Sequence, residues 1–309
     1  MSKYEYLLKK IKETDFSDEP FKHLYIENFF NVKDFDEIIN SPQINLPKVN
    51  SDRELYNSLK KNGYGIISFP GTSTNFNQYE SWHKSKENSK LVSETTTSFG
   101  IVFRLEKPDT RIKELFDFIG SDIFNNTISE KFEIEQSNLT SDGGIQKYLD
   151  GYEISPHPDI RKKALTFMVN INPNYKNQDY NTHYLKFKDK WNYIKEFWKY
   201  NDNYDRCWVP WDWCKTEKVQ KANNSIVIFS PSDETMHAVR ANYNHLDSQR
   251  TQLYGNLWYN NINIKNKPEW EDYIIGENIK SSKKINSFKE LFHKINERVS
   301  RKNTLKRNI

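Results

Sequence analysis

Residues 152–172 read YEISPHPDIRKKALTFMVNIN, which joins the triplet His157-Pro158-Asp159 to a long apolar run. The run, Ala164–Asn172, is partly β-branched, and Pro173 ends it, as is typical of a buried strand. Residues i and i+2 of a strand share one face, so a strand through the triplet would bring the side chains of His157 and Asp159 together. The stretch therefore predicts a β structure that presents an imidazole beside a carboxylate.

A second histidine, His237, follows another short apolar strand. That strand is Ser225–Phe229, and the polar turn Ser230–Glu234 leads the chain from it to His237. A third strand is expected at Thr251–Trp258. Two imidazoles and one carboxylate suit Fe(II), because they fill one face of an octahedron and leave positions open for a cosubstrate and O2. We expect His157, Asp159 and His237 to hold that iron.

A His-x-Asp triplet is by itself a weak signal, and the chain contains a second one, His245-Leu246-Asp247. This second triplet lies in the polar stretch 242–249, which is typical of a turn. We interpret it as a chance occurrence. The first triplet differs because each of its partners lies on or beside an expected strand.

Taken in order, the motifs between residues 144 and 258 resemble the iron- and 2-oxoglutarate-dependent dioxygenases, nearest to the prolyl-hydroxylase-like branch. The residues that carry the resemblance are Tyr148–Tyr152, His157-Pro158-Asp159, Thr166–Asn172, Ile226–Phe229, His237 and Arg250, and Pro20–Phe30 is similar to the opening segment of many members. The resemblance implies a double-stranded β-helix, or jelly roll, and decarboxylation of 2-oxoglutarate coupled to oxidation of a substrate. The cofactors it implies are Fe(II), 2-oxoglutarate and O2, with ascorbate as an accessory reductant.

Carried over by position, the resemblance makes Arg250 the partner of the distal carboxylate of 2-oxoglutarate, with Tyr148 and Thr166 beside the same cosubstrate. Arginine suits this role because its planar fork donates two parallel hydrogen bonds and stays charged when buried. Arg240 is the competing residue, but at i+3 from His237 on one strand it would face away from the iron. The alternatives are a surface arginine at 250 and ordinary barrel residues at 148 and 166.

The expected activity is hydroxylation of an unactivated C–H bond in a small molecule or a peptidyl side chain, with release of succinate and CO2. In the resembling family, halogenating members carry a small residue where this chain has Asp159, so the carboxylate favours hydroxylation. Two alternatives stay open. One is a noncatalytic or differently metal-dependent cupin-like barrel, and the other is a nucleic-acid oxidative demethylase, whose signature Arg240-Ala241-Asn242 reproduces poorly.

The composition is compatible with a packed hydrophobic core. The 309 residues are only 36% hydrophobic, but 15% are aromatic and carry large apolar surfaces. No apolar run is long enough to span a bilayer and Met1–Phe16 lacks a secretory core, so we expect a cytoplasmic protein with no membrane partner. A basic tail, residues 280–309, has ten Lys or Arg against two Glu and so carries +8, which leaves −4 for residues 1–279 of the net charge of +4. We interpret this tail as an amphipathic helix with a solvated face. A nucleic-acid partner is not expected, and oligomeric state leaves no mark in the sequence.

The fold class expected is mainly β with flanking helices (α+β), in one domain. Residues 1–95 would form helical support and first strands, 96–265 the jelly-roll core with an insertion at 174–221, and 266–309 the C-terminal basic helix. Upstream elements expected are a helix capped by Ser51–Glu54 and ended by Asn62-Gly63, strands at Tyr64–Phe69 and Ser98–Leu105, a helical stretch over 77–88, and a helix through Leu115–Ile119. The aromatic-rich segment 175–213 would be a lid or an inserted packing unit. Cys207 and Cys214 have neither zinc-ligand nor disulfide-framework spacing and are expected to be reduced.

Overall fold

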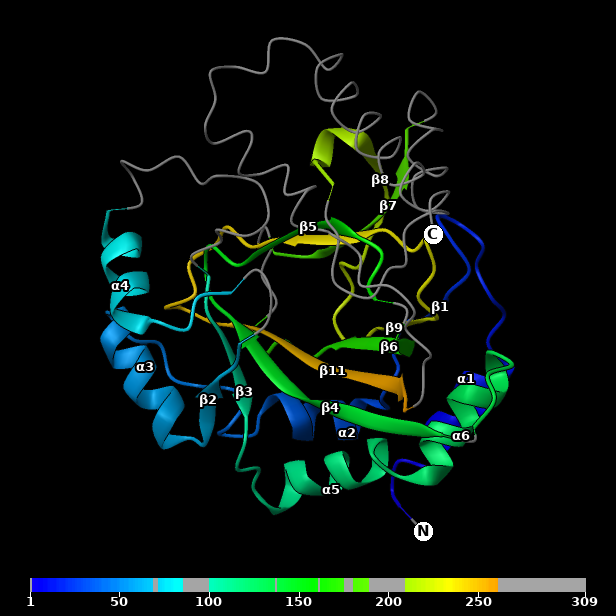
Figure 1. The fold of residues 1–309 in the computed structure, drawn as a ribbon. Coiled ribbons are helices and arrows are strands. Elements are labelled where there is room, and N and C mark those ends of the chain that lie inside the picture. Colours follow the sequence, from blue (N-terminus) through cyan, green and yellow to red (C-terminus); the bar gives the residue numbers. More distant parts are fainter. Residues whose placement is uncertain are drawn as a thin grey trace.

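Two antiparallel sheets face one another across the centre of the protein (Figure 1). The structure is a computed structural model that describes residues 2–68, 72–85, 100–136, 138–160, 162–174, 180–188 and 209–260. The expected C-terminal helix over 266–309 and the whole of the segment 189–208, which includes Cys207, lie outside the described residues. Division of the chain into domains stays a prediction.

The large sheet has seven strands and the small sheet four. Their spatial orders are β1 (Leu24–Ile26), β9 (Ile226–Phe229), β6 (Lys163–Asn170), β11 (Arg250–Tyr259), β4 (Leu139–Tyr148), β3 (Val102–Leu105) and β2 (Tyr64–Ile66) in the large sheet, and β5 (Glu153–His157), β10 (His237–Arg240), β7 (Thr182–Phe187) and β8 (Cys214–Val219) in the small one. From β4 to β11 the chain passes back and forth between the two sheets, which is the winding of a jelly roll. The predicted fold class is confirmed.

Helices cover the outer face of the large sheet. The described helices are α1 (Tyr6–Glu13), α2 (Val32–Ile39), α3 (Asp52–Lys61), α4 (Phe76–Lys84), α5 (Thr110–Ile119) and α6 (Asp122–Lys131). Figure 1 shows α1, α2, α5 and α6 below the large sheet, with α3 and α4 at the end where β2 and β3 lie. The main hydrophobic core fills the space between these helices and the sheet.

Strand alternation gives the large sheet two different faces. On β11, Leu253 and Leu257 belong to the core under the helices, while Arg250, Gln252 and Asn256 face the space between the sheets. Successive side chains of a strand point to opposite faces, so one strand serves both the packing core and the cavity. The polar side chains of Arg250, Gln252 and Asn256 therefore line the cavity.

The N-terminal elements follow their sequence signals. Ser51 caps α3 by accepting a hydrogen bond from the backbone N–H of Glu54, and Gly63 adopts a φ of 87° after the helix ends. The predicted strands are confirmed as β2 and β3, and the predicted helices as α4 and α5. No helix among the described residues is both long and apolar enough to cross a membrane.

The segment 174–221 contains two strands of the small sheet, which the sequence did not predict. Within it, β7 pairs with β10 on one side and with β8 on the other. Both strands are short, and β8 is half exposed, so neither carries the continuous apolar run of a buried strand. Cys214 begins β8 as a buried free thiol, which agrees with the expected reduced state.

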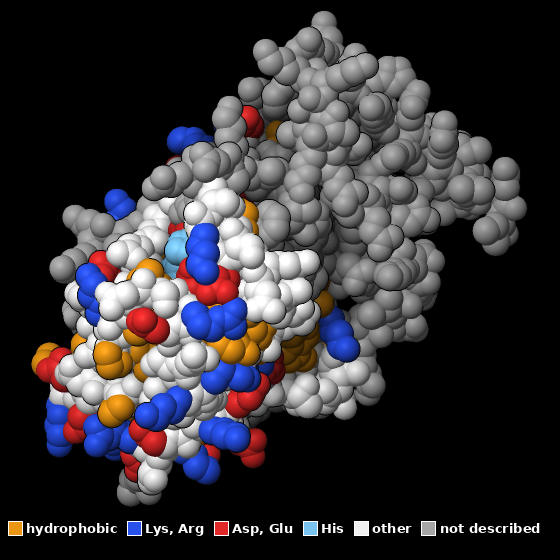
Figure 2. All heavy atoms as spheres, turned by 90° about the vertical axis from the view of Figure 1, so that its left-hand side faces the viewer, with side chains coloured by type: hydrophobic (Ala, Val, Ile, Leu, Met, Phe, Trp, Pro, Cys, Tyr) orange, Lys and Arg blue, Asp and Glu red, His pale blue; other side chains and the backbone are white. Residues whose placement is uncertain are grey.

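Charged side chains of both signs are interspersed on the surface shown in Figure 2.

Inside the fold, a lysine is fully buried: Lys147 donates hydrogen bonds to the carbonyl oxygen of Ile44 (2.7 Å) and to Oγ1 of Thr251 (2.8 Å). Burial lowers the pKa of Lys147 to about 7, because an ammonium loses its hydration there.

This buried lysine makes stability depend on pH. Between pH 7 and 10 the unfolded chain binds a proton at Lys147 that the folded chain does not, so the free energy of unfolding should rise with pH across that window. Lys147→Met should flatten this rise, whereas Lys60→Met, at an exposed position of α3, should leave it unchanged. Thermal unfolding of the three proteins at pH 7, 8 and 9 is the measurement. An equally steep rise in the Lys147→Met variant would show that another group is responsible.

Candidate active site

Three residues far apart in the chain meet at one end of the small sheet. His157 is the last residue of β5, His237 is the first of β10, and the two are direct partners in the antiparallel register. Asp159 lies two residues beyond the end of β5, with a φ of 65°. The expectation that Asp159 shares a strand with His157 was therefore wrong. The left-handed backbone conformation of Asp159 turns its carboxylate back toward the two histidines. Aspartate adopts this conformation more readily than most residues.

The three side chains surround a gap suited to a metal ion rather than a hydrogen bond. Nε2 of His157 is 3.5 Å from Oδ1 of Asp159, and Nε2 of His237 is 3.8 Å from Oδ2. The ligand atoms of the three residues all lie within 4.8 Å of one another. Hydrogen bonds at these atoms would bring them to about 2.8–3.0 Å, so the arrangement leaves room for a cation between them.

Backbone carbonyls fix the orientation of both imidazoles. Nδ1 of His157 lies 2.9 Å from the carbonyl oxygen of Ser155, and Nδ1 of His237 lies 2.9 Å from that of Thr235. A carbonyl oxygen only accepts, so each Nδ1 carries the proton and each Nε2 presents its lone pair to the gap. This is the tautomer required for metal binding through Nε2.

Burial and neighbouring charges set the ionisation of this group. Burial, together with the nearby His157, lowers the pKa of His237 to about 3, so the imidazole is neutral at neutral pH. Burial alone would raise the pKa of Asp159, but Lys163 and the two histidines hold that pKa well below its ordinary value. The neutral imidazole of His237 and the carboxylate of Asp159 are thus available together.

Lys163 is a site residue that the sequence analysis missed. Its Nζ lies 2.9 Å from Oδ2 of Asp159 and donates to the hydroxyl of Tyr254 at 2.8 Å. Thr166 also donates to Oδ2 of Asp159, at 2.9 Å, and it is absent from the cavity lining described below. Both donors orient the carboxylate, which leaves Oδ1 turned toward His157. The signal for Lys163 was a lysine at the start of a strand that is otherwise buried throughout.

A cavity of about 440 Å³ opens in front of these three side chains, between the sheets. Its polar lining beyond the three residues comes mainly from β4 and β11, with contributions from β3, β6 and β7. These lining residues are Arg104, Asp142, Gln146, Tyr148, Lys163, Thr182, Arg250, Gln252, Tyr254 and Asn256. Arg104 and Asp142 form an ion pair at 3.1 Å within this wall. The volume is that of a site for a small ligand.

Arg250 is buried in this wall, and no carboxylate of the described part of the chain pairs with it. Only 2% of the residue is exposed, its Nη2 donates to Oγ1 of Thr182 at 3.0 Å, and its guanidinium lies 4.4 Å from the ring centroid of Tyr148. Its Nη1 is buried and has no hydrogen-bond partner among the described residues. Leaving a buried donor of a charged group unsatisfied is costly, so the position is suited to binding an anion.

Arg240 lies elsewhere, as expected from strand alternation. It pairs with Glu153 at 3.1 Å and lies over the ring of Trp211 at 4.8 Å, outside the cavity. Tyr148, in contrast, lines the cavity, and its hydroxyl donates to Oε1 of Gln146 at 2.6 Å. Of the three residues predicted to contact the cosubstrate, Arg250 and Tyr148 therefore face the cavity and Thr166 does not.

The histidine and the aspartate of the second His-x-Asp triplet lie in different environments. Asp247 is at the surface and pairs with Lys48, whereas His245 is fully buried and lies 2.8 Å from Oδ1 of Asp52 on α3. The triplet itself is therefore not a ligand pair, which agrees with its interpretation as a chance occurrence, but the burial of His245 was not expected. A polar turn gave no sign of burial, because the contact joins residues that are distant in the sequence.

Comparisons with known proteins give similarity in structure alone. No protein-family model matches the chain, and no curated protein matches it. In fold, the chain is similar to 2-oxoglutarate- and iron-dependent oxygenases. The crystal structure of a Pseudomonas putida prolyl-4-hydroxylase is 8% identical, with a TM-score of 0.41, and the match covers 83% of this chain and 98% of that one.

Two further solved structures are similar at the same level. The epimerase SnoN in complex with Fe3+, alpha ketoglutarate and nogalamycin RO is 9% identical with a TM-score of 0.41, covering 85% of this chain and 91% of that one. A prolyl hydroxylase from Trichoplax adhaerens, in complex with a hypoxia inducible factor peptide fragment, is 9% identical with a TM-score of 0.37, covering 83% and 88%. Because these identities and TM-scores are low, the function is inferred from the residues of this chain.

Proposed function

We propose that the protein is a 2-oxoglutarate-dependent oxygenase that holds Fe(II) through His157, Asp159 and His237. The observation that supports this most is that one cavity contains both this group and the buried, unpaired Nη1 of Arg250. Two imidazoles and a carboxylate are the ligand set of non-haem Fe(II) oxygenases, and they leave coordination positions open. A cosubstrate with two carboxylates explains why the guanidinium of Arg250 lies in the same cavity as the three metal ligands.

Each residue has a definite task in this proposal. Bound iron would supply O2 activation coupled to oxidative decarboxylation of 2-oxoglutarate to succinate and CO2. Lys163 and Thr166 hold Oδ2 of Asp159, so that Oδ1 is the oxygen directed to the metal. Arg250 binds the distal carboxylate with two hydrogen bonds, and its contact with Tyr148 keeps the guanidinium plane in place. Because Arg250 is buried away from water, the ion pair with that carboxylate would be stronger than at the surface.

The substrate proposed is a small molecule or a peptidyl side chain, oxidised by hydroxylation at an unactivated C–H bond. The cavity volume limits what reaches the metal to a small group, and the Arg104–Asp142 pair offers one charge of each sign to it. Such a wall suits a polar substrate rather than a purely apolar one.

An anaerobic titration tests the proposal. Metal-free protein should bind Fe(II) without visible colour, and addition of 2-oxoglutarate should then produce a visible charge-transfer band, because its keto and carboxylate oxygens chelate the iron. Succinate is the matched control: it can pair with Arg250 but lacks the keto group, so it should give no band. Iron binding without a band in the presence of 2-oxoglutarate would instead support a differently metal-dependent barrel.

A further inference from the structure

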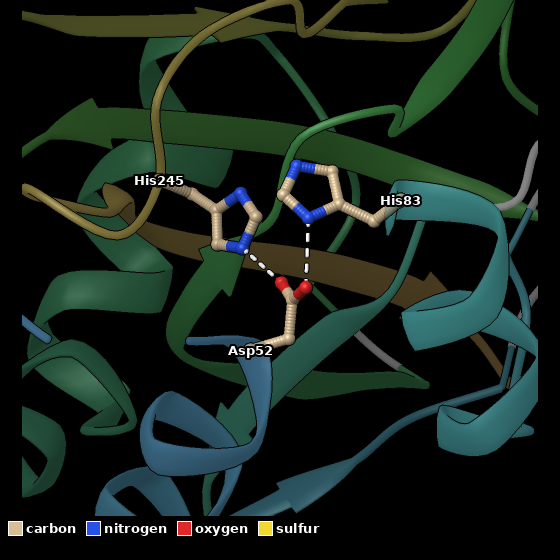
Figure 3. Close-up of side chains that lie close together, drawn as sticks. All are labelled: Asp52, His83 and His245. Atoms are coloured by element: carbon tan, nitrogen blue, oxygen red, sulfur yellow. Dashed lines mark hydrogen bonds and ion pairs between the residues drawn. The ribbon is translucent and has the colours of Figure 1, made fainter. Parts of the chain in front are cut away.

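A second group of two histidines and one aspartate lies outside the cavity, where α3, α4 and the loop before β11 meet (Figure 3). Asp52 is the first residue of α3, His83 is near the end of α4, and His245 comes from the loop between β10 and β11. Figure 3 shows the carboxylate of Asp52 pointing up between the two rings, with one oxygen toward each. We call these three residues the α3–α4 cluster.

The contacts within the cluster are short and use every oxygen of Asp52. Oδ1 is 2.8 Å from Nε2 of His245, and Oδ2 is 2.8 Å from Nδ1 of His83. On its other side, Nε2 of His83 lies 3.5 Å from Oδ2 of the fully buried Asp150. All three ligand atoms of the cluster lie within 4.8 Å of one another, as in the cavity group.

The cluster lies in a region of buried negative charge. Asp52 and Asp150 are both buried carboxylates, and within the described residues the ion pairs of Asp52 are made only with the two histidines. Buried carboxylates are costly unless positive charge compensates them. A divalent cation between Asp52 and the two imidazoles would supply that charge.

We propose that the α3–α4 cluster is a second metal site, of the type that binds Zn2+. Its ligands are the carboxylate of Asp52, Nδ1 of His83 and Nε2 of His245, which are the nitrogen and oxygen donors that zinc accepts in tetrahedral sites. When the metal binds, the proton of each neutral imidazole moves to its other ring nitrogen: Nε2 of His83, beside Asp150, and Nδ1 of His245, which is buried without a hydrogen-bond partner among the described residues. Since zinc bonds are about 2.0–2.2 Å long, the ligand atoms part by only a few tenths of an ångström.

The surroundings of the cluster fit a metal in two further respects. Asp150 is placed to accept a hydrogen bond from Nε2 of His83, which is the carboxylate–histidine–metal arrangement that orients zinc ligands. His83 keeps 21% of its side chain exposed, and histidine atoms reach the surface on the face shown in Figure 2. This side gives the ion a route in and a water molecule a place as the fourth ligand.

A metal bound at the cluster would stabilise the loop that leads to Arg250. The carbonyl oxygen of His245 accepts from Nε2 of Gln249 at 2.7 Å, and Asp150 accepts from the backbone N–H of Tyr243 at 2.9 Å. The hydroxyl of Tyr243 in turn accepts from the backbone N–H of Arg250 at 2.9 Å. Zinc bound at the cluster would therefore stabilise the loop between β10 and β11 together with both helices, and raise the melting temperature.

The test removes the two histidines of the cavity group, so that the zinc binding that remains reports on the α3–α4 cluster. The variant His157→Ala/His237→Ala, stripped by a chelator and titrated with Zn2+, should bind one equivalent, and zinc should raise its melting temperature. Adding His83→Ala should abolish both the equivalent and the rise. Asp52→Asn, which keeps the size of the side chain, serves the same purpose if the His83→Ala variant is poorly folded.

The control addition is His183→Ala, at a histidine of β7 that hydrogen-bonds Thr216 outside both groups, and it should leave the bound equivalent unchanged. The proposal is overturned if the His157→Ala/His237→Ala protein takes up no zinc, or if its equivalent survives both His83→Ala and Asp52→Asn. The cluster would then be held by protons alone. Neither result bears on the charge-transfer test of the cavity group, so the two proposals fail separately.

Discussion

Replacing His237 with alanine is expected to abolish Fe(II) binding at the cavity and, with it, succinate formation from 2-oxoglutarate. The variant keeps only one imidazole and one carboxylate, and loss of even an outer partner of a metal ligand typically costs 10- to 100-fold in affinity. Removal of a ligand itself should weaken Fe(II) binding by more than about 100-fold on that scale. His157→Ala should behave in the same way, because the two residues are partners in the β5–β10 register.

Asp159→Asn is the sharper version of this experiment. Asparagine tolerates the left-handed backbone that Asp159 adopts, so the fold should persist while the ligand charge is lost. Iron content after anaerobic reconstitution and 2-oxoglutarate-dependent succinate release are the two measurements. His183→Ala is the matched control, because its imidazole lies outside the cavity lining. Normal succinate release by any of the three ligand variants would refute the assignment.

Arg250→Met should raise the concentration of 2-oxoglutarate required by two to three orders of magnitude while Fe(II) binding is retained. Truncating one member of a buried, hydrogen-bonded charge pair costs about 2–5 kcal/mol, and tenfold in affinity is about 1.4 kcal/mol. Methionine fills much of the space of the guanidinium stem, which limits damage to the packing against Tyr148. The dissociation constant from the charge-transfer titration is the measurement.

Two other variants make the Arg250 result specific. Arg250→Lys should recover only part of the affinity, because an ammonium does not reproduce the planar two-hydrogen-bond fork. Arg240→Met should leave the 2-oxoglutarate requirement as it is, since Arg240 pairs with Glu153 outside the cavity. If Arg250→Met leaves the requirement unaltered, the anion-binding role of Arg250 is wrong and the cavity takes another ligand.

Much of the core fold was predictable because its signals are local. The apolar runs that became β6 and β9, and the capping signals of α3, depend on side-chain period and on hydrogen bonds between residues a few positions apart. The strands β7 and β8 were missed because they are short and partly exposed on the small sheet. Their pairing with β10 and with each other is a long-range contact without a local pattern.

The candidate site was predictable in its residue types and less so in its geometry. The sequence indicated His157, Asp159, His237 and Arg250, since two imidazoles, a carboxylate and an arginine spaced along strands match one chemistry. It did not indicate that Asp159 lies past the strand end, nor that Thr166 contacts Asp159 instead of lining the cavity. The position of Asp159 depends on its positive φ angle. The contact of Thr166 depends on which face of β6 lies against the turn that contains Asp159.

By itself, then, the sequence determined the strand pattern of the jelly roll and the set of donor groups that its cavity contains. Only the tertiary structure decided that Lys163 lies against Asp159, that Nη1 of Arg250 is buried without a partner, and that Asp52, His83 and His245 meet. The reason is that period and capping are properties of neighbouring residues. Burial and charge pairing, in contrast, arise where segments up to about two hundred residues apart pack together.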